Sequence, residues 1–172
     1  MKTNFNFRKA GLMQAALLVI AFVAVTLTGC QKTEMVSTDD LSYEKLAANA
    51  VFSITHEGDV KQTLPAFRFQ ITQDGTLIYR GIRNVKTLGT VKIHLEPDVI
   101  DKIQIILVEA AFDQMQDGYE YDELGDHCIT NAKFPGLQKQ VVDYGLNTPD
   151  MLPTLKLQIE TLVGVTALAK GI

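Results

Sequence analysis

The chain has 172 residues, of which 47% are hydrophobic and 21% charged, so its composition is that of one ordinary globular domain. It holds 16 Lys and Arg against 20 Asp and Glu. Since the first 29 residues carry three basic side chains and no acid, the remainder has 13 against 20, a formal charge of −7. This balance disfavours a nucleic-acid partner, because binding to a phosphate backbone depends on clustered Lys and Arg.

The amino-terminal segment has the order of a secretory signal peptide, with a basic start followed by an uncharged apolar run of 16 residues, Leu12–Leu27. This run is shorter than the ~20 residues that a membrane-spanning helix needs. It is followed by a cysteine, in the sequence Leu27-Thr28-Gly29-Cys30. These four residues resemble the lipobox of bacterial lipoprotein precursors.

The resemblance implies that residues 1–29 are a signal peptide that is removed, and that Cys30 then carries a diacylglyceryl group and an N-acyl group such as palmitate. More than one acyl chain anchors a protein stably to a membrane. Gln31, in place of Asp, implies sorting to the outer membrane, so we expect the protein on the periplasmic face of the outer membrane of a Gram-negative bacterium. An ordinary cleaved signal and an uncleaved anchor are the alternatives. With Cys30 acylated, Cys128 has no partner for an internal disulfide.

Residues 30–49 are polar beyond the cysteine and are expected to form a tether, and residues 50–172 are expected to form a single globular domain. The domain begins with short alternating runs, which predict four strands at residues 51–55, 66–72, 76–81 and 88–95. Asp74-Gly75 predicts a tight hairpin between the second and third of these, because Gly accepts the positive φ of such a turn.

A helix is predicted to begin at Pro97 and to end near Gly118, because apolar residues recur there at helical spacing. Residues 127–134 and 138–144 flank Pro135-Gly136 and predict a second hairpin. Thr148 as the cap and Pro149 as the first residue predict a final helix. The predicted order is four strands, helix, two strands, helix, which indicates an α+β fold with an antiparallel sheet in two layers and two helices on one face.

Two stretches of this domain, QDGTLIYRG (73–81) and EPDVIDKIQIILVEAAF (96–112), together with the Pro-initiated last helix, resemble an uncharacterised domain of bacterial lipoproteins, domain of unknown function 6438. The resemblance covers about residues 51–164. Members of that family often carry paired cysteines near the first loop, and this chain has none there. The family implies a fold and no activity.

Acidic residues are concentrated in the loop that follows the first predicted helix. A twelve-residue calcium loop beginning at Asp113 would lack its bidentate ligand, because Leu124 stands at the twelfth position. The weak metal candidates of this loop are Asp117, Glu120, Asp122 and His127. We expect no metal and no cofactor other than the covalent lipid. His127 and Cys128 are adjacent on a predicted strand, so their side chains point to opposite faces and cannot form a hydrogen-bonded pair.

Four basic side chains are predicted to share the sheet face that points away from the helices: Arg68, Arg80, Lys92 and His94. They could bind an anionic polymer or an acidic protein surface, although an ordinary solvated sheet face explains them as well. The sequence therefore favours a lipid-anchored envelope protein without enzymatic activity that binds a protein or a cell-wall component. The alternative is a metal-dependent enzyme or accessory factor that uses loop 117–127.

Overall fold

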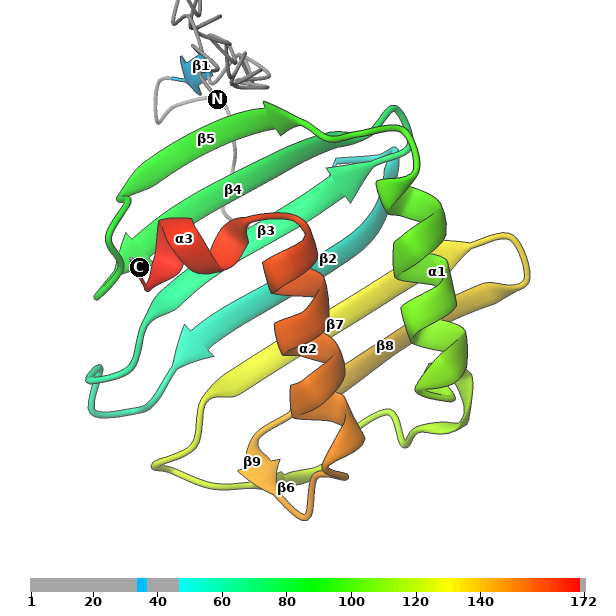
Figure 1. The fold of residues 1–172 in the computed structure, drawn as a ribbon. Coiled ribbons are helices and arrows are strands. Elements are labelled where there is room, and N and C mark those ends of the chain that lie inside the picture. Colours follow the sequence, from blue (N-terminus) through cyan, green and yellow to red (C-terminus); the bar gives the residue numbers. More distant parts are fainter. Residues whose placement is uncertain (1–33, 37–46, 171–172) are drawn as a thin grey trace, which may run out of the picture. The chain divides into compact units, whose positions relative to one another are not determined.

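The computed structural model describes residues 34–36 and 47–170, so the predicted signal peptide and Cys30 lie outside the described residues. The described chain is a mixed α+β domain with a large antiparallel sheet and three α-helices (Figure 1). No helix within these two ranges is long and apolar enough to cross a membrane. The strands of the large sheet are β1 (Glu34–Val36), β2 (Ala50–Gly58), β3 (Ala66–Thr72), β4 (Thr76–Arg83), β5 (Gly89–His94), β7 (His127–Phe134) and β8 (Leu137–Asp143).

The helices are α1 (Val99–Glu109), α2 (Met151–Leu162) and α3 (Val165–Ala169), with a short 3-10 turn, η1 (Phe112–Gln114), after α1. Two further strands, β6 (Glu120–Tyr121) and β9 (Gly145–Leu146), pair with each other outside the large sheet. The structure therefore adds β1, β6, β9, η1 and α3 to the predicted elements.

The large sheet has the order β1-β5-β4-β3-β2-β7-β8, and every neighbouring pair is antiparallel. Strands β2 to β5 form a meander, and the hairpin of β7 and β8 joins it at β2 (Figure 1). Strand β2 is thus paired on both sides. Local periodicity does not predict this pairing, because Thr130 lies 76 residues after its partner Ile54.

The predicted hairpin at Asp74-Gly75 is confirmed. Gly75 has a φ of 81°, and its backbone N–H donates to the carbonyl of Thr72 at 2.9 Å. The Asp74 carboxylate accepts hydrogen bonds from the Thr72 hydroxyl and, at 3.2 Å, from the backbone N–H of Thr76. Residues 73–75 thus connect β3 and β4, and such local bonding is why Asp before Gly favours a tight turn.

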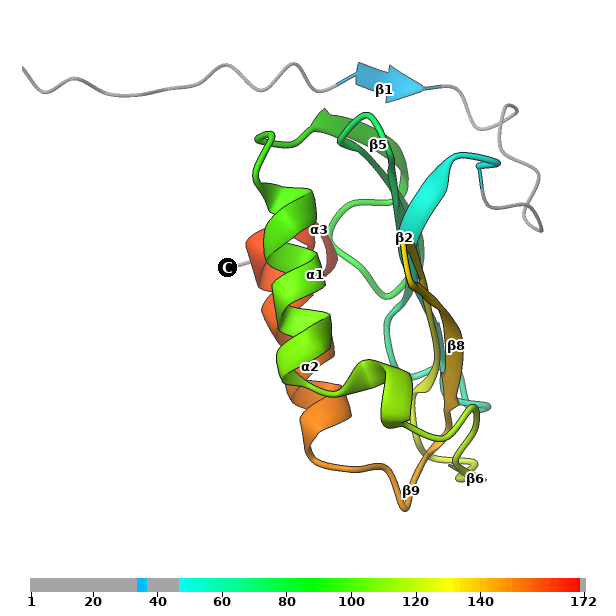
Figure 2. The same ribbon diagram turned by 90° about the vertical axis from the view of Figure 1, so that its right-hand side faces the viewer.

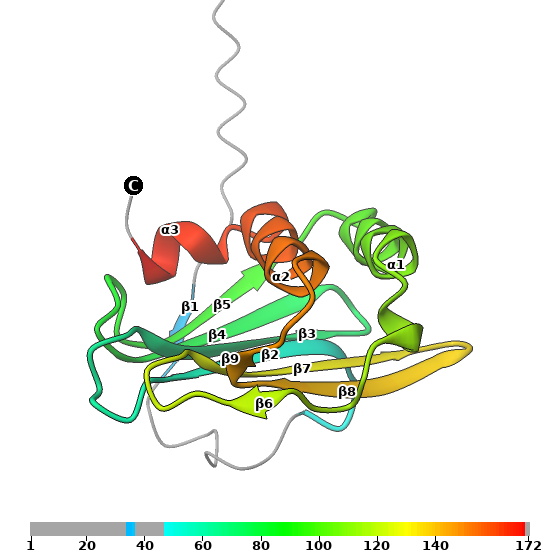
Figure 3. The same cartoon turned by 90° about the horizontal axis from the view of Figure 1, so that it is seen from below.

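One face of the sheet and the apolar stripes of the helices form the core. Figure 3 shows the three helices on the same side of the sheet, and Figure 2 shows α1 and α2 beside it in the perpendicular view. The buried side chains include Phe67, Phe69 and Ile71 from β3, Val99, Ile103 and Leu107 from α1, and Leu152, Leu155 and Ile159 from α2. Burial of each such side chain contributes roughly 1.5–3 kcal/mol.

Both predicted helix boundaries need correction. Helix α1 begins at Val99 and ends at Glu109, because Ala111 takes a left-handed φ of 49° and the chain turns there. Helix α2 begins at Met151 with Asp150 at the cap position. The hydroxyl of Thr148 does not cap this helix, since it donates to the buried Asp143 carboxylate at 2.6 Å.

A few residues of the predicted tether are described by the structure. Residues Glu34–Val36 form strand β1, which pairs antiparallel with β5 at the edge of the large sheet. A short part of residues 30–49 is therefore a strand.

Candidate functional site

Five ionisable side chains meet in the interface between helix α2 and the sheet. They are His56 on β2, Asp126 before β7, Asp143 on β8, and Lys156 and Glu160 on α2. Four of these side chains are 5–12% exposed, and that of Asp126 is 33% exposed. We call these five residues the buried charged cluster. Burial of so many charged groups is rare in proteins unless they are paired.

Strand register and helical spacing place the buried charged cluster. His56 is the register partner of Cys128, and Cys128 is the partner of Asp143, so the three lie in one row across β2, β7 and β8. Lys156 and Glu160 are four residues apart on α2 and therefore project from the same face of the helix. This face covers the row.

The His56 imidazole is held on both sides. Its Nδ1 atom is hydrogen-bonded to Oδ2 of Asp126, and its Nε2 atom lies 2.7 Å from Oε1 of Glu160. The ring also stacks on Phe67, with 4.5 Å between the centroids. Burial opposes protonation of His56, but the hydrogen bonds to the two carboxylates outweigh it and raise its pKa above 6.5. The geometry thus favours a charged imidazolium.

Lys156 and Asp143 form the second pair of the cluster. The Lys156 Nζ atom lies 2.7 Å from Oδ2 of Asp143. The other oxygen of this carboxylate accepts from the Thr148 hydroxyl at 2.6 Å and from the backbone N–H of Gly145 at 2.9 Å. Burial raises the pKa of Asp143, but the bonds from Lys156 and Thr148 outweigh it and hold that pKa below its usual value.

Cys128 lies within the cluster and is fully buried. Burial raises the pKa of its thiol to about 12, so the thiol is neutral at physiological pH. A neighbouring imidazole can accept the proton of a thiol only through a free ring nitrogen, and both nitrogens of His56 are bonded to carboxylates. This arrangement is that of a structural cysteine.

The weak metal candidates of the acidic loop have separate partners. Asp117 accepts from Lys139 Nζ at 2.8 Å, Glu120 accepts from the Asn147 amide at 2.6 Å, and the Asp122 side chain accepts from the backbone N–H of Leu124 at 3.0 Å. The His127 ring bonds to the backbone carbonyl of Asp122 at 3.0 Å and packs against Tyr121 and Tyr144. Within the described ranges, no group of three or more His, Cys, Asp or Glu side chains is arranged to hold a metal ion.

The predicted basic residues lie on adjoining strands. Arg68 on β3 is the register partner of Arg80 on β4, and Arg80 is the partner of Thr90 on β5. Lys92 lies two residues beyond Thr90, and His94 lies at the end of β5. Arg68 and Arg80 both take part in interactions within the chain. The register therefore brings the two arginines together and leaves His94 at the margin.

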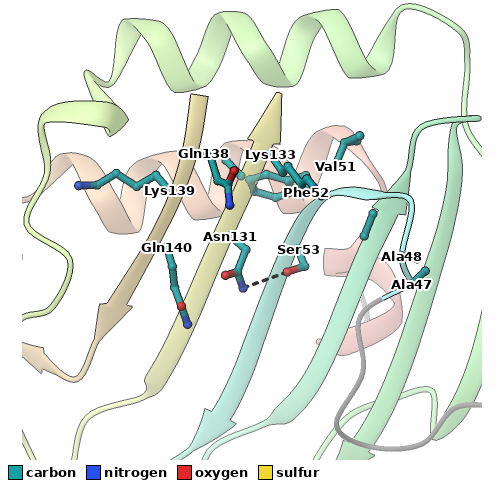
Figure 4. Close-up of a pocket in the computed structure, with 12 residues that line it drawn as sticks. Ala47, Ala48, Val51, Phe52, Ser53, Asn131, Lys133, Gln138, Lys139 and Gln140 are labelled. Carbon is teal, nitrogen blue, oxygen red and sulfur yellow. Dashed lines mark hydrogen bonds between the residues drawn. The ribbon is translucent and has the colours of Figure 1, made fainter. Parts of the chain in front are cut away.

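The sheet also carries a hollow of about 390 Å³ over β2, β7 and β8 (Figure 4). Its polar side chains include Ser53, Asn131, Gln138 and Gln140, and the Asn131 amide donates to the Ser53 hydroxyl at 3.2 Å. Figure 4 shows these residues on neighbouring strands. We call this feature the amide-lined hollow.

Sequence reasoning missed both the buried charged cluster and the amide-lined hollow, because each needs the β2–β7 pairing. The spacing of Lys156 and Glu160 on an otherwise apolar helix face was the available signal for the cluster.

Over the residues that the structure describes, the fold and these features define the class of protein as a small α+β domain built on a seven-stranded antiparallel sheet. Residues 63–163 match the model of a family described as Domain of unknown function (DUF6438), and the chain belongs to this family. The match begins after β2, whereas the resemblance predicted residues 51–164. No curated protein and no solved structure matches the chain.

Proposed function

We propose that this chain is a lipid-anchored protein of the bacterial envelope whose domain binds another protein or a cell-wall polymer and has no enzymatic activity. In this proposal the domain has two layers, with the core order of four strands, helix, two strands, helix. The helices cover one face of the sheet and leave the opposite face to the partner.

The lipobox residues Leu27 to Cys30 support the anchor. A diacylglyceryl group and an N-acyl group on Cys30 would hold the domain at a membrane surface, because each buried methylene contributes about 0.8 kcal/mol. Gln31 supports the periplasmic face of the outer membrane as the location.

The observation that carries the binding role is the contrast between the two sides of the sheet. On the helix side, Cys128 is fully buried, and both ring nitrogens of His56 are bonded to carboxylates. On the other side, the amide-lined hollow and the row of Arg68 and Arg80 bring polar and basic side chains together. Convergent polar groups beside a hollow are typical of binding sites.

The metal-dependent alternative has less support. It needs Asp117, Glu120, Asp122 and His127 to converge on one point, and their side chains bond to different groups. Added zinc or calcium that raised the thermal stability of the protein would favour this alternative.

A crosslinking pull-down from intact envelopes tests the proposal. The lipidated wild type is expected to recover a reproducible partner, and the double variant Arg68→Glu/Arg80→Glu is expected to recover less of it. Because both arginines also interact within the chain, the thermal stability of the double variant is measured in parallel.

The matched control reverses two charges on the helix side, Lys102→Glu/Lys170→Glu. This control should recover the partner as the wild type does. Equal recovery by the folded Arg68/Arg80 variant and the wild type would contradict the role of this face, and recovery of no partner by the wild type would contradict the binding function.

A further inference from the structure

Strand β8 lies at the edge of the large sheet, with β7 as its neighbour on one side. In an antiparallel pair, successive residues direct their backbone groups alternately toward the neighbour and away from it. The two-residue turn Pro135-Gly136 makes Phe134 and Leu137 a hydrogen-bonded pair. Leu137, Lys139 and Val141 therefore bond to β7, and the backbone groups of Gln138, Gln140 and Val142 point to the open edge.

The chain itself covers part of this edge. The backbone N–H of Val142 donates to the carbonyl of Asp117 at 2.9 Å, and the carbonyl of Val142 accepts from the N–H of Tyr119 at 3.0 Å. Gly118 forms a parallel bridge with Val142, so a short segment already adds to β8 at this point. At Gln138 and Gln140, the residues that the structure describes supply no backbone partner on the open side.

The surface beside this open stretch has polar groups that can contact the side chains of an added strand. Gln138 and Gln140 are exposed and line the amide-lined hollow together with Asn131 and Ser53 (Figure 4). A strand added to β8 would direct alternate side chains to this face of the sheet.

The charge along the edge favours an acidic occupant. The sequence from His127 to Val142 contains two lysines and no acidic residue. Lys139 already bonds to Asp117 at 2.8 Å, so the charge that an occupant can complement is that of Lys133. Lys133 is exposed at the rim of the hollow. An extended peptide that carries Asp or Glu would complement this charge.

We propose that the edge of β8 at Gln138 and Gln140 binds an extended, acidic peptide segment of a partner protein by strand addition. This inference rests on the proposed binding function and selects a protein, not a cell-wall polymer, as the partner. The two residues offer two backbone donors and two acceptors, and the amide-lined hollow selects side chains, as in other complexes formed by β-augmentation.

A second copy of the chain fits this edge less well. Antiparallel pairing of two β8 strands that aligns Gln138 with Gln140 would place Lys139 opposite the Lys139 of the other copy. Like charges that are directly opposite destabilise a strand pair. Lysine on an edge strand also opposes pairing between identical edges.

The test uses the lipidated full-length protein in detergent and a phage-displayed library of random nonapeptides. Enriched peptides are expected to carry Asp or Glu between β-forming residues. Their binding is then compared between the wild type, Gln140→Pro and Gln140→Ala. Since the Gln140 N–H points away from β7, proline removes a donor of the open edge and leaves the β7–β8 ladder intact.

We expect Gln140→Pro to bind the peptide about tenfold or more weakly than Gln140→Ala, which removes the same side chain and keeps the backbone donor. Bound peptide should also slow amide hydrogen exchange at Gln138 and Gln140. If Gln140→Pro fails to fold, N-methylation of alternate peptide residues serves as the second measurement, because it removes the partner's donors and should abolish binding to the wild type.

Three results would overturn strand addition: no enriched peptide, equal binding by folded Gln140→Pro, or a β8-dependent dimer that excludes the peptide. The envelope pull-down separates this failure from that of the proposed function. If Gln140→Pro still recovers the partner and the Arg68/Arg80 variant does not, the proposed binding function is supported. The β8 edge is then not the binding site.

Discussion

The Nε2 atom of His56 on β2 lies 2.7 Å from the Oε1 atom of Glu160 on α2, so a charged hydrogen bond joins the sheet to the helix that covers it. The other ring nitrogen of His56 bonds to Asp126, which also accepts from the backbone N–H of Gly58 at 3.2 Å. One imidazole therefore holds both helix α2 and the loop that enters β7.

Glu160→Ala is expected to lower the free energy of unfolding by about 3 kcal/mol, because it removes one partner of a buried charge and leaves His56 incompletely compensated. Glu160→Gln, which keeps a hydrogen-bonding oxygen, should cost less. Urea denaturation monitored by circular dichroism measures both changes. Glu109→Ala at the exposed end of α1 is the control and should stay within about 0.5 kcal/mol of the wild type. An equal effect of Glu109→Ala and Glu160→Ala would contradict the role of the cluster.

The stability of the domain is expected to depend on pH through His56. The pKa of His56 in the folded state is raised above its unfolded value of 6.5, so the folded protein binds a proton at His56 more tightly than the unfolded chain does. The stabilisation is fully present below pH 6.5 and is lost as pH rises through the folded pKa. Unfolding free energies measured on both sides of this window should fall with rising pH for the wild type. In His56→Gln the decline should be smaller, and an identical decline in both proteins would exclude His56 as its source.

The thiol of Cys128 is expected to be unreactive in the folded protein. It is buried, and its pKa is raised to about 12 by burial, whereas the thiolate is the form that attacks alkylating reagents. In a Cys30→Ala background, a maleimide should label Cys128 in urea and leave it unlabelled in buffer at neutral pH. Mass spectrometry counts the adducts, and Cys128→Ala in the same background is the control. Rapid labelling in buffer would show that the thiol is accessible.

Cys30→Ala is expected to abolish lipidation and to release the protein from the membrane fraction. Metabolic labelling with a fatty-acid analogue, followed by fractionation, measures both effects. The Cys128→Ala variant is the control. It should incorporate as much fatty-acid label as the wild type, because Cys30 is still present. A labelled Cys30→Ala protein would refute the assignment of Cys30 as the acylated residue.

The elements of this fold that depend on neighbouring residues could be predicted from the sequence. The Asp74-Gly75 turn and the buried face of β3 follow from backbone sterics and from the period of two along a strand. Helix ends were less predictable: Thr148 has the chemistry of a cap, but in the folded chain its hydroxyl reaches the buried Asp143 carboxylate. The left-handed Ala111 that ends the turn after α1 has no local sequence signal.

The sequence by itself determined the candidate anchor at Cys30, the alternating faces of the strands and the apolar stripes of the helices, because each depends on residues within a few positions of one another. Only the tertiary structure decided that β7 pairs with β2, since any two strands with one apolar face satisfy the same local pattern. That pairing brings Asp143 and Cys128 beside His56 under α2, and it places Asn131 beside Ser53 in the amide-lined hollow. The sequence does not show which charged or amide side chains will contact each other. These side chains form a site only when strands that are distant in the sequence pair in a defined register.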